Sequence, residues 1–216
     1  MAAAIRSSAN YDENFQSTIM KQIVDKMNSL GMFHPGYVSG RSYATFPNVN
    51  STAAAVPAID TIYFYPFVLP RRVLINALTA RTTTSGAGSS GKLAIYASSL
   101  TTMNPVGAPV AKDETGFTTQ SSSQDRSAAL SPSVQLEDGL LYWGASKFTG
   151  TLPTMVNVAA GNLQTSFMRG STGSGITLNS LSMADTYASA WPTIAAAQAF
   201  TELASSGVPQ LGFTVA

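Results

Sequence analysis

Few side chains of this sequence can perform acid–base, nucleophilic or metal-binding chemistry. The chain has one histidine, His34, and no cysteine, so thiolate nucleophiles, Cys-ligated zinc and disulfides are excluded. Any catalytic triad, imidazole base or histidine metal site would have to use His34. It stands in the Gly- and Pro-rich stretch at residues 33–40, where a histidine is more typical of a turn than of a catalytic site. The lack of cysteine also agrees with assembly in a reducing cytoplasm.

Carboxylates are the remaining acid–base candidates, and the 11 Asp and Glu residues are scattered along the chain. Adjacent pairs occur at residues 12–13, 113–114 and 137–138, all in polar or turn-like surroundings. Neighbouring residues of a strand point to opposite faces, so none of these pairs is by itself an acid–base dyad. We therefore predict that the protein is not an enzyme and has no catalytic residue, metal or cofactor. A glycan-active enzyme that uses carboxylates is the remaining catalytic alternative.

A glycine-rich stretch matches two phosphate-binding patterns. Gly86, Gly88 and Gly91 give GxGxxG, and residues 86–92 give GxxxxGK. Both motifs bind phosphate through backbone N–H groups at the beginning of a helix. Here the stretch leads into KLAIYAS, which alternates like a strand, and Leu93 replaces the Ser or Thr that ligates Mg²⁺ in a P-loop. We interpret the glycines as a hairpin tip, which disfavours nucleotide binding.

Charge and hydropathy limit the partners of the chain. Charged residues make up 11% of the 216 residues, against about 25% in an average soluble domain, and the net charge is +1. The longest basic run is the pair at residues 71–72, so we expect no nucleic-acid partner. No stretch approaches the roughly 18 apolar residues of a membrane-spanning helix, and we expect no membrane span. The first residues lack the apolar core of a secretory signal.

The sequence of residues 1–35 predicts an N-terminal arm, which carries an amphipathic helix at residues 11–31. Polar residues can cap the start of this helix, and Gly31 can end it. One face carries an apolar stripe made of Phe15, Ile19, Ile23, Met27 and Leu30. A 3-4-3 spacing that starts at Met20 also permits a short coiled coil. Because it covers only about two heptads, packing on the same chain or on a neighbour is favoured. In either case we interpret the arm as an attachment device.

Residues 36–58 contain several Pro and Gly residues and no helical period, which predicts an extended connector. Residues 59–216 predict a β-sandwich domain. Runs with a period of two predict strands at residues 61–68, 72–84, 92–98, 108–112, 141–148, 154–159 and 211–215. Residues 193–205 predict a short helix across the sandwich. With no βαβ rhythm, the fold class is mainly β, an antiparallel, jelly-roll-like β-sandwich with an N-terminal α-helix and an extended connector.

The order of these segments is more specific than any single motif. The chain reads YFYPF at residues 63–67, RVLINALT at 72–79, GKLAIYA at 91–97, GAPV at 107–110 and LEDGLLYWGA at 136–145. This ordered set resembles the β-sandwich module at the ends of tailed-bacteriophage tail fibres, head fibres and spikes, in which segments of these kinds recur in this order. The resemblance covers about residues 60–150, and the terminal strand extends it.

The resemblance implies a virion protein, assembled in the host cytoplasm, that forms a homotrimer. As a short fibre or spike it would bind a host-surface glycan without enzymatic activity, and its N-terminal arm would contact other virion proteins. A capsid decoration or cement protein, which clamps or ornaments the shell without binding a receptor, is the alternative. Independently of the resemblance, the low charge and the mean hydropathy of +0.11 favour an oligomer that buries apolar surface.

Aromatic side chains near loops are the candidate glycan-binding residues, because the C–H faces of sugars stack on aromatic rings. Trp191 precedes Pro192 in a stretch with turn character, and Tyr187 lies shortly before it. We predict that these two rings bind the glycan; the alternative for Trp191 is a packing or interface residue. Trp143 follows Tyr142 within a predicted strand and is expected to pack in the core.

Overall fold

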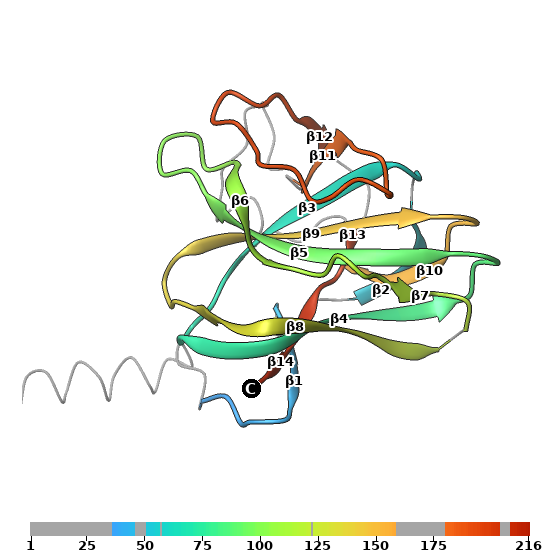
Figure 1. Cartoon of the computed structure of the whole chain (residues 1–216), viewed down its shortest axis with the longest axis horizontal. Helices are drawn as coiled ribbons and strands as arrows, with labels where there is room; N and C mark the ends of the chain where they lie inside the picture. Colours follow the sequence, from blue (N-terminus) through green and yellow to red (C-terminus); the bar gives the residue numbers. More distant parts are fainter. Residues whose placement is uncertain (1–35, 46–50, 57, 122, 159–179, 204–207) are drawn as a thin grey trace, which may run out of the picture. The chain divides into compact units, whose positions relative to one another are not determined.

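Two antiparallel sheets stacked face to face make up the described part of the protein (Figure 1). The computed structural model describes residues 36–45, 51–56, 58–121, 123–158, 180–203 and 208–216, and these contain no helix. The chain divides into two compact units, Met1–Gly36 and Tyr37–Ala216. His34 and the predicted N-terminal helix lie outside the described residues. The same holds for the apolar stripe of that helix, Phe15, Ile19, Ile23, Met27 and Leu30.

Sheet A is built around a long strand that changes its partner halfway. Its strands are β1 (Ser42–Ala44), β2 (Ser51–Ala55), β4 (Val73–Thr84), β8 (Gln124–Leu136), β10 (Thr154–Val158), β13 (Val208–Pro209) and β14 (Gly212–Val215). Along one side β4 pairs with β8, and along the other it pairs first with β14 and then with β10. The outer positions are taken by β1 on β14 and by β2 and β13 on β10.

Sheet B has three central strands with shorter strands on both sides. Its strands are β3 (Thr61–Val68), β5 (Ser90–Ser98), β6 (Pro105–Lys112), β7 (Phe117–Thr118), β9 (Leu141–Thr149), β11 (Ser180–Ala184) and β12 (Thr201–Leu203). The centre runs β3-β9-β5; β11 and β12 extend it beyond β3, and β6 and β7 pair with β5. β11 pairs with β3 only as far as Phe64, so Pro66 lies where β3 has left β11. That position tolerates a residue without a backbone N–H.

Each strand predicted from the sequence is confirmed, as β3, β4, β5, β6, β9, β10 and β14. The predicted mainly β, antiparallel architecture is confirmed as well. The short helix predicted at residues 193–205 is wrong for the part that the structure describes. The Ala-rich sequence favours a helix, but Ile194 exchanges two backbone hydrogen bonds of 2.9 Å with Gly107 of β6. Tertiary contacts therefore override the local propensity.

Residues 36–58, predicted as an extended connector, contribute two edge strands to sheet A. β1 pairs with β14, and β2 pairs with β10. Tyr37 and Tyr43 pack around Phe213, with ring centroids 5.5 and 6.2 Å from that of Phe213. The described part of this segment is therefore built into the sandwich, and the two compact units divide at residue 36. Pro and Gly residues obscure strands this short in a search for periodicity.

The core between the sheets is made of aromatic and aliphatic side chains from both. Tyr65 of β3 is fully buried there; its hydroxyl donates to the Leu211 carbonyl at 3.0 Å and accepts from the Leu211 N–H at 2.6 Å. Thr45 Oγ1 lies 2.6 Å from the same hydroxyl. Burial raises the pKa of Tyr65, so the group stays neutral. Gly144 of β9 lies opposite, where a Cβ would come within 2.9 Å of the Tyr65 ring, so the position requires glycine.

The central strands of sheet B are buried on both faces. Tyr63 and Phe67 of β3 point into the core between the sheets, whereas Ile62 and Phe64 belong to a second apolar cluster on the far face. Residues 185–200, here called the strap, cover that far face. Figure 1 shows the strap in orange and red beyond sheet B, on the side away from sheet A. Burial on both faces explains why β3 reads as an unbroken apolar run.

Candidate functional site

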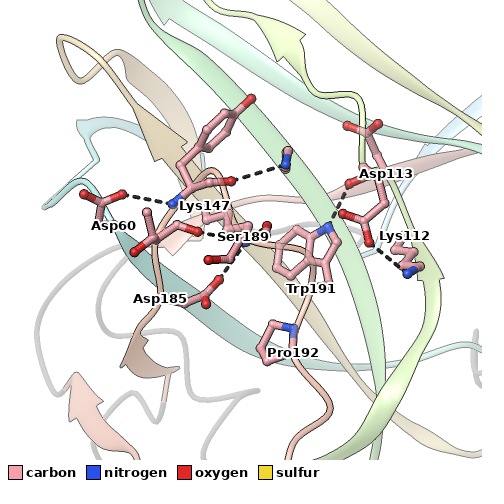
Figure 2. Close-up of polar contacts among 12 residues, drawn as sticks. Asp60, Lys112, Asp113, Lys147, Asp185, Ser189, Trp191 and Pro192 are labelled. Carbon is pink, nitrogen blue, oxygen red and sulfur yellow. Dashed lines mark hydrogen bonds and ion pairs between the residues drawn. The ribbon is translucent and has the colours of Figure 1, made fainter.

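Trp191, predicted to bind a glycan, lies on the strap with its ring against the outer face of sheet B (Figure 2). It is 5% exposed, and its Nε1 donates a 2.7 Å hydrogen bond to the Asp113 carbonyl oxygen. Its ring also meets Tyr96 edge to face at 6.3 Å. The expectation of an accessible Trp191 ring is therefore corrected: the protein itself covers the ring, as in the packing alternative. Trp143 is 0% exposed, which confirms its predicted place in the core.

Tyr187, the second predicted glycan-binding residue, is half-buried near the beginning of the strap. Its backbone N–H donates to Asp60 Oδ1 at 2.9 Å, and Lys92 Nζ lies 4.9 Å from its ring centroid. Burial raises the pKa of Tyr187, and the charge of Asp113 raises it further. Because a lysine uses one face of the Tyr187 ring and Trp191 is covered, the two rings do not form a joint stacking platform. A role of Tyr187 in glycan binding stays a prediction.

A buried ammonium group lies beneath the strap (Figure 2). The Lys147 side chain of β9 is 0% exposed, and its Nζ lies 2.6 Å from Asp185 Oδ2. It also donates to the carbonyl oxygens of Ser189 (2.8 Å) and Thr186 (3.3 Å), and it lies 4.9 Å from the Trp191 ring centroid. The three donors of the ammonium group are thus matched by three acceptors. A lysine satisfied in this way holds two segments together.

Lys92 of β5 lies directly opposite Lys147 in the register of β5 and β9. Its Nζ donates to the Tyr187 carbonyl oxygen at 3.2 Å. Like charges at opposing positions of a sheet repel each other, and here each ammonium group is turned toward carbonyl oxygens of the strap. The two lysines therefore fix the strap through its backbone as well as through Asp185.

The carboxylates near the strap are engaged in local structure. Asp113 accepts from the N–H groups of Thr115 (2.9 Å) and Gly116 (3.0 Å). Glu114 pairs with Lys112 at 2.8 Å. Burial raises the pKa of Glu114, but Lys112, a hydrogen bond from the Trp191 backbone and the charge of Lys92 together lower it by more, so the net shift is downward. The adjacent pair at residues 113–114 thus makes two separate structural contacts. Among the described residues, no group of three or more His, Asp or Glu side chains could hold a metal ion.

The glycine-rich stretch connects β4 of sheet A to β5 of sheet B. It is therefore a crossing between the sheets, not the predicted tip of a hairpin between paired strands. The Gly86 N–H donates to the Thr119 carbonyl oxygen at 3.2 Å, and a Cβ at Gly91 would lie 2.7 Å from the Phe148 ring. The stretch leads into a strand, as predicted, so its geometry is not that of a phosphate loop at a helix N-terminus.

A groove on the face of sheet A that points away from the core is a second candidate site, which sequence reasoning missed. It lies where β4 changes its partner, because β14 pairs with β4 as far as Thr79 and β10 begins at Thr82. Its volume is about 270 Å³. The polar part of its lining comes from Ser42, Thr79, Arg81, Asp125 and Gln210. A Cβ at Gly212 would come within 2.5 Å of Thr79 Oγ1, so glycine lets β14 pass this close to β4.

An ion pair borders the groove. Arg81 Nη1 lies 2.9 Å from Asp125 Oδ1, and the two side chains are 51% and 75% exposed. Arg81 and Asp125 are direct partners in the register of β4 and β8. The pair places N–H donors beside carboxylate acceptors that ligands can reach. A charged residue within the Thr-rich end of β4 was a visible signal in the sequence, but its partner lies on a strand that the sequence did not predict.

No family model matches the chain, and no curated protein does either. In the part of the chain that the structure describes, no helix is both long and apolar enough to cross a membrane. The two candidate sites differ in geometry. The polar cluster under the strap is closed and internally satisfied, whereas the groove is open and presents polar side chains beside a larger apolar surface.

Proposed function

We propose that this protein is a non-enzymatic component of a bacteriophage virion, a short fibre or spike whose jelly-roll-like β-sandwich binds a host-surface glycan through the groove of sheet A. The sequence resemblance to fibre and spike modules supports the virion assignment. The mainly β, antiparallel architecture is the one that this resemblance implies. In this proposal the N-terminal arm, residues 1–35, attaches the chain to other virion proteins, and the sandwich forms a homotrimer.

The observation that carries the proposal is the set of polar side chains within a groove whose lining is otherwise mostly apolar. Arg81 and Asp125 place donors and acceptors side by side, and Thr79, Ser42 and Gln210 add hydroxyl and amide groups. Neighbouring hydroxyl groups of a sugar ring both donate and accept, so side chains of this kind bind them in pairs. The volume of about 270 Å³ lies near the lower end of the range for small-molecule sites, roughly 300–1,000 Å³, and is suited to one sugar ring.

The same lining favours binding over hydrolysis. Glycosidases use two carboxyl groups that flank the scissile bond. Asp125 is the one carboxylate among the described residues that line the groove, and it is already paired with Arg81. A small, open site of this kind binds a single sugar weakly, and three copies on a trimer raise the overall affinity through effective concentration.

Binding of the full-length protein to purified host-surface polysaccharide tests the proposal. Arg81→Ala and Asp125→Ala are expected to weaken binding about tenfold or more, because a hydrogen bond to a charged group contributes roughly 1.5–3 kcal/mol. The matched controls are Lys112→Ala and Glu114→Ala, which remove an exposed ion pair of 2.8 Å outside the groove. These controls are expected to bind like the wild type.

Two outcomes would redirect the assignment. Unchanged polysaccharide binding by the Arg81→Ala/Asp125→Ala double variant would remove the groove from the binding site. If particles that lack this protein still adsorb to the host but lose shell stability, the chain is a decoration or cement protein instead.

A further inference from the structure

We infer that the strap, residues 185–200, opens as a unit by local unfolding. Its opening uncovers an apolar face of sheet B while the sandwich stays folded. This inference does not depend on glycan binding, because the proposed glycan groove lies on the other sheet. It concerns a conformational device built into the fold.

The face beneath the strap is an apolar cluster of its own. Phe64, Tyr96 and Trp143 are fully buried there and come from β3, β5 and β9. Phe64 and Tyr96 meet edge to face at 5.7 Å, and Phe200 and Trp191 pack against them. Side chains of the same strands that point the other way belong to the core between the sheets. Because sheet B separates the two clusters, loss of the outer one leaves the packing of the inner one in place.

The strap is joined to its surroundings by few backbone hydrogen bonds among the described residues. Ile194 and Gly107 exchange a pair of 2.9 Å, and the Asp185 N–H donates to the Asp60 carbonyl oxygen at 3.0 Å. The other polar contacts between the strap and sheet B run through side chains. The central strands β3, β9 and β5, by contrast, pair along most of their length. A segment held in this way opens locally at a lower free energy than the whole domain unfolds.

Lys147 holds the strap in its closed position. The partners described above for its ammonium group, Asp185, Thr186, Ser189 and Trp191, all belong to the strap. In the closed state the ammonium group needs the charge of Asp185, because an unpaired buried charge is strongly unfavourable. In the open state water solvates both charges. Opening therefore replaces the protein contacts of Lys147 with water and leaves no unpaired charge inside the sandwich.

Substitutions of Lys147 and Asp185 distinguish this mechanism from an ordinary loss of packing. Asp185→Asn keeps the shape of the side chain but leaves Lys147 buried without a counter-charge, so it favours the open state. Lys147→Met removes the charge and keeps an unbranched apolar side chain against Trp191. The double variant Lys147→Met/Asp185→Asn joins two neutral side chains, and we expect its strap to stay closed like that of the wild type.

Hydrogen exchange of the full-length protein measures the opening directly. The Ile194 amide reports on the strap, and the amides of β9 report on the sandwich. Trp143 and Trp191, the two tryptophans of the chain, both lie in the covered cluster, so intrinsic fluorescence reports on the same event. We expect Asp185→Asn to accelerate exchange at Ile194 on the order of 100-fold, with a shift of emission to longer wavelength and no change in β9.

The wild type and a surface variant complete the test. In the wild type the Ile194 amide should already exchange faster than the β9 amides. Leu100→Ala, which shortens a side chain that is 88% exposed, should change neither rate. Equal exchange rates of strap and β9 in the wild type, equal acceleration of both in Asp185→Asn, or an unchanged strap in that variant would each overturn the inference.

Discussion

The outer faces of the two sheets differ in the side chains that they carry and in how far the described residues cover them. The outer face of sheet B is mostly apolar, with Lys92 and Lys147 turned toward the strap, and the strap covers it through Trp191 and Ile194. The outer face of sheet A carries Arg81, Asp125 and hydroxyl groups, and none of the described residues covers it at the groove. The difference follows the strand sequences, since β3 has no polar residue in its buried stretch whereas the end of β4 alternates. One face therefore contributes stability, and the other remains accessible to ligands.

The largest expected effect lies on the covered face. Trp143→Ala should lower the free energy of unfolding by about 3–5 kcal/mol, because it leaves a cavity beneath the strap. Urea denaturation measures this difference. Leu100→Ala is the control: Leu100 is 88% exposed, and its removal should change stability by less than about 0.5 kcal/mol. Similar values for both variants would show that the outer face of sheet B is not packed as described.

A smaller effect is expected from Trp191→Phe. The variant keeps an aromatic ring on sheet B but loses the 2.7 Å hydrogen bond from Nε1 to the Asp113 carbonyl oxygen. The strap should be destabilised by about 1 kcal/mol, read as an increase of roughly five- to tenfold in hydrogen exchange at Ile194. Polysaccharide binding should stay at the wild-type level, and a strong loss of binding would return Trp191 to the glycan site.

The smallest effect on stability is expected at the groove. Arg81→Ala should change the free energy of unfolding by less than about 1 kcal/mol, since exposed ion pairs contribute little. The same variant should lose polysaccharide affinity, and Arg81→Lys should restore only part of it because a lysine lacks the planar fork of arginine. A large drop in melting temperature for Arg81→Ala would mean that the pair is structural, which would weaken the contrast between the two faces.

The strands with clear composition could be predicted from the sequence, because β-branched and aromatic runs such as those of β3, β5 and β9 specify them locally. β8 was missed because it is rich in Ser, Ala and Gln and contains Pro132, which is typical of an edge strand rather than a central one. The helix expected at residues 193–205 failed for a different reason. Its local propensity is real, but the hydrogen bonds of Ile194 go to Gly107.

The candidate sites depend on contacts between distant residues, which local patterns do not reveal. The pairing of Arg81 with Asp125 requires the register of β4 and β8. Lys147 is a charged residue in a mostly apolar strand, which is a visible signal in the sequence. The sequence does not show, however, that Asp185 and Ser189 surround it. For the same reason Trp191 had the sequence context of an exposed loop residue, although the strap folds it onto sheet B.

The free edge of strand β8 affects whether copies of this protein can pair with one another through their sheets. Among the described strands β8 pairs only with β4, so its other side is an edge that could recruit a strand from a second molecule. The register with β4 shifts between Ile75 and Ala77, and Pro132, which has no N–H, lies in the stretch of β8 between the two registers. The edge is thus interrupted near its middle and offers no long regular template. Copies that are packed side by side should therefore not join through this edge into a continuous sheet.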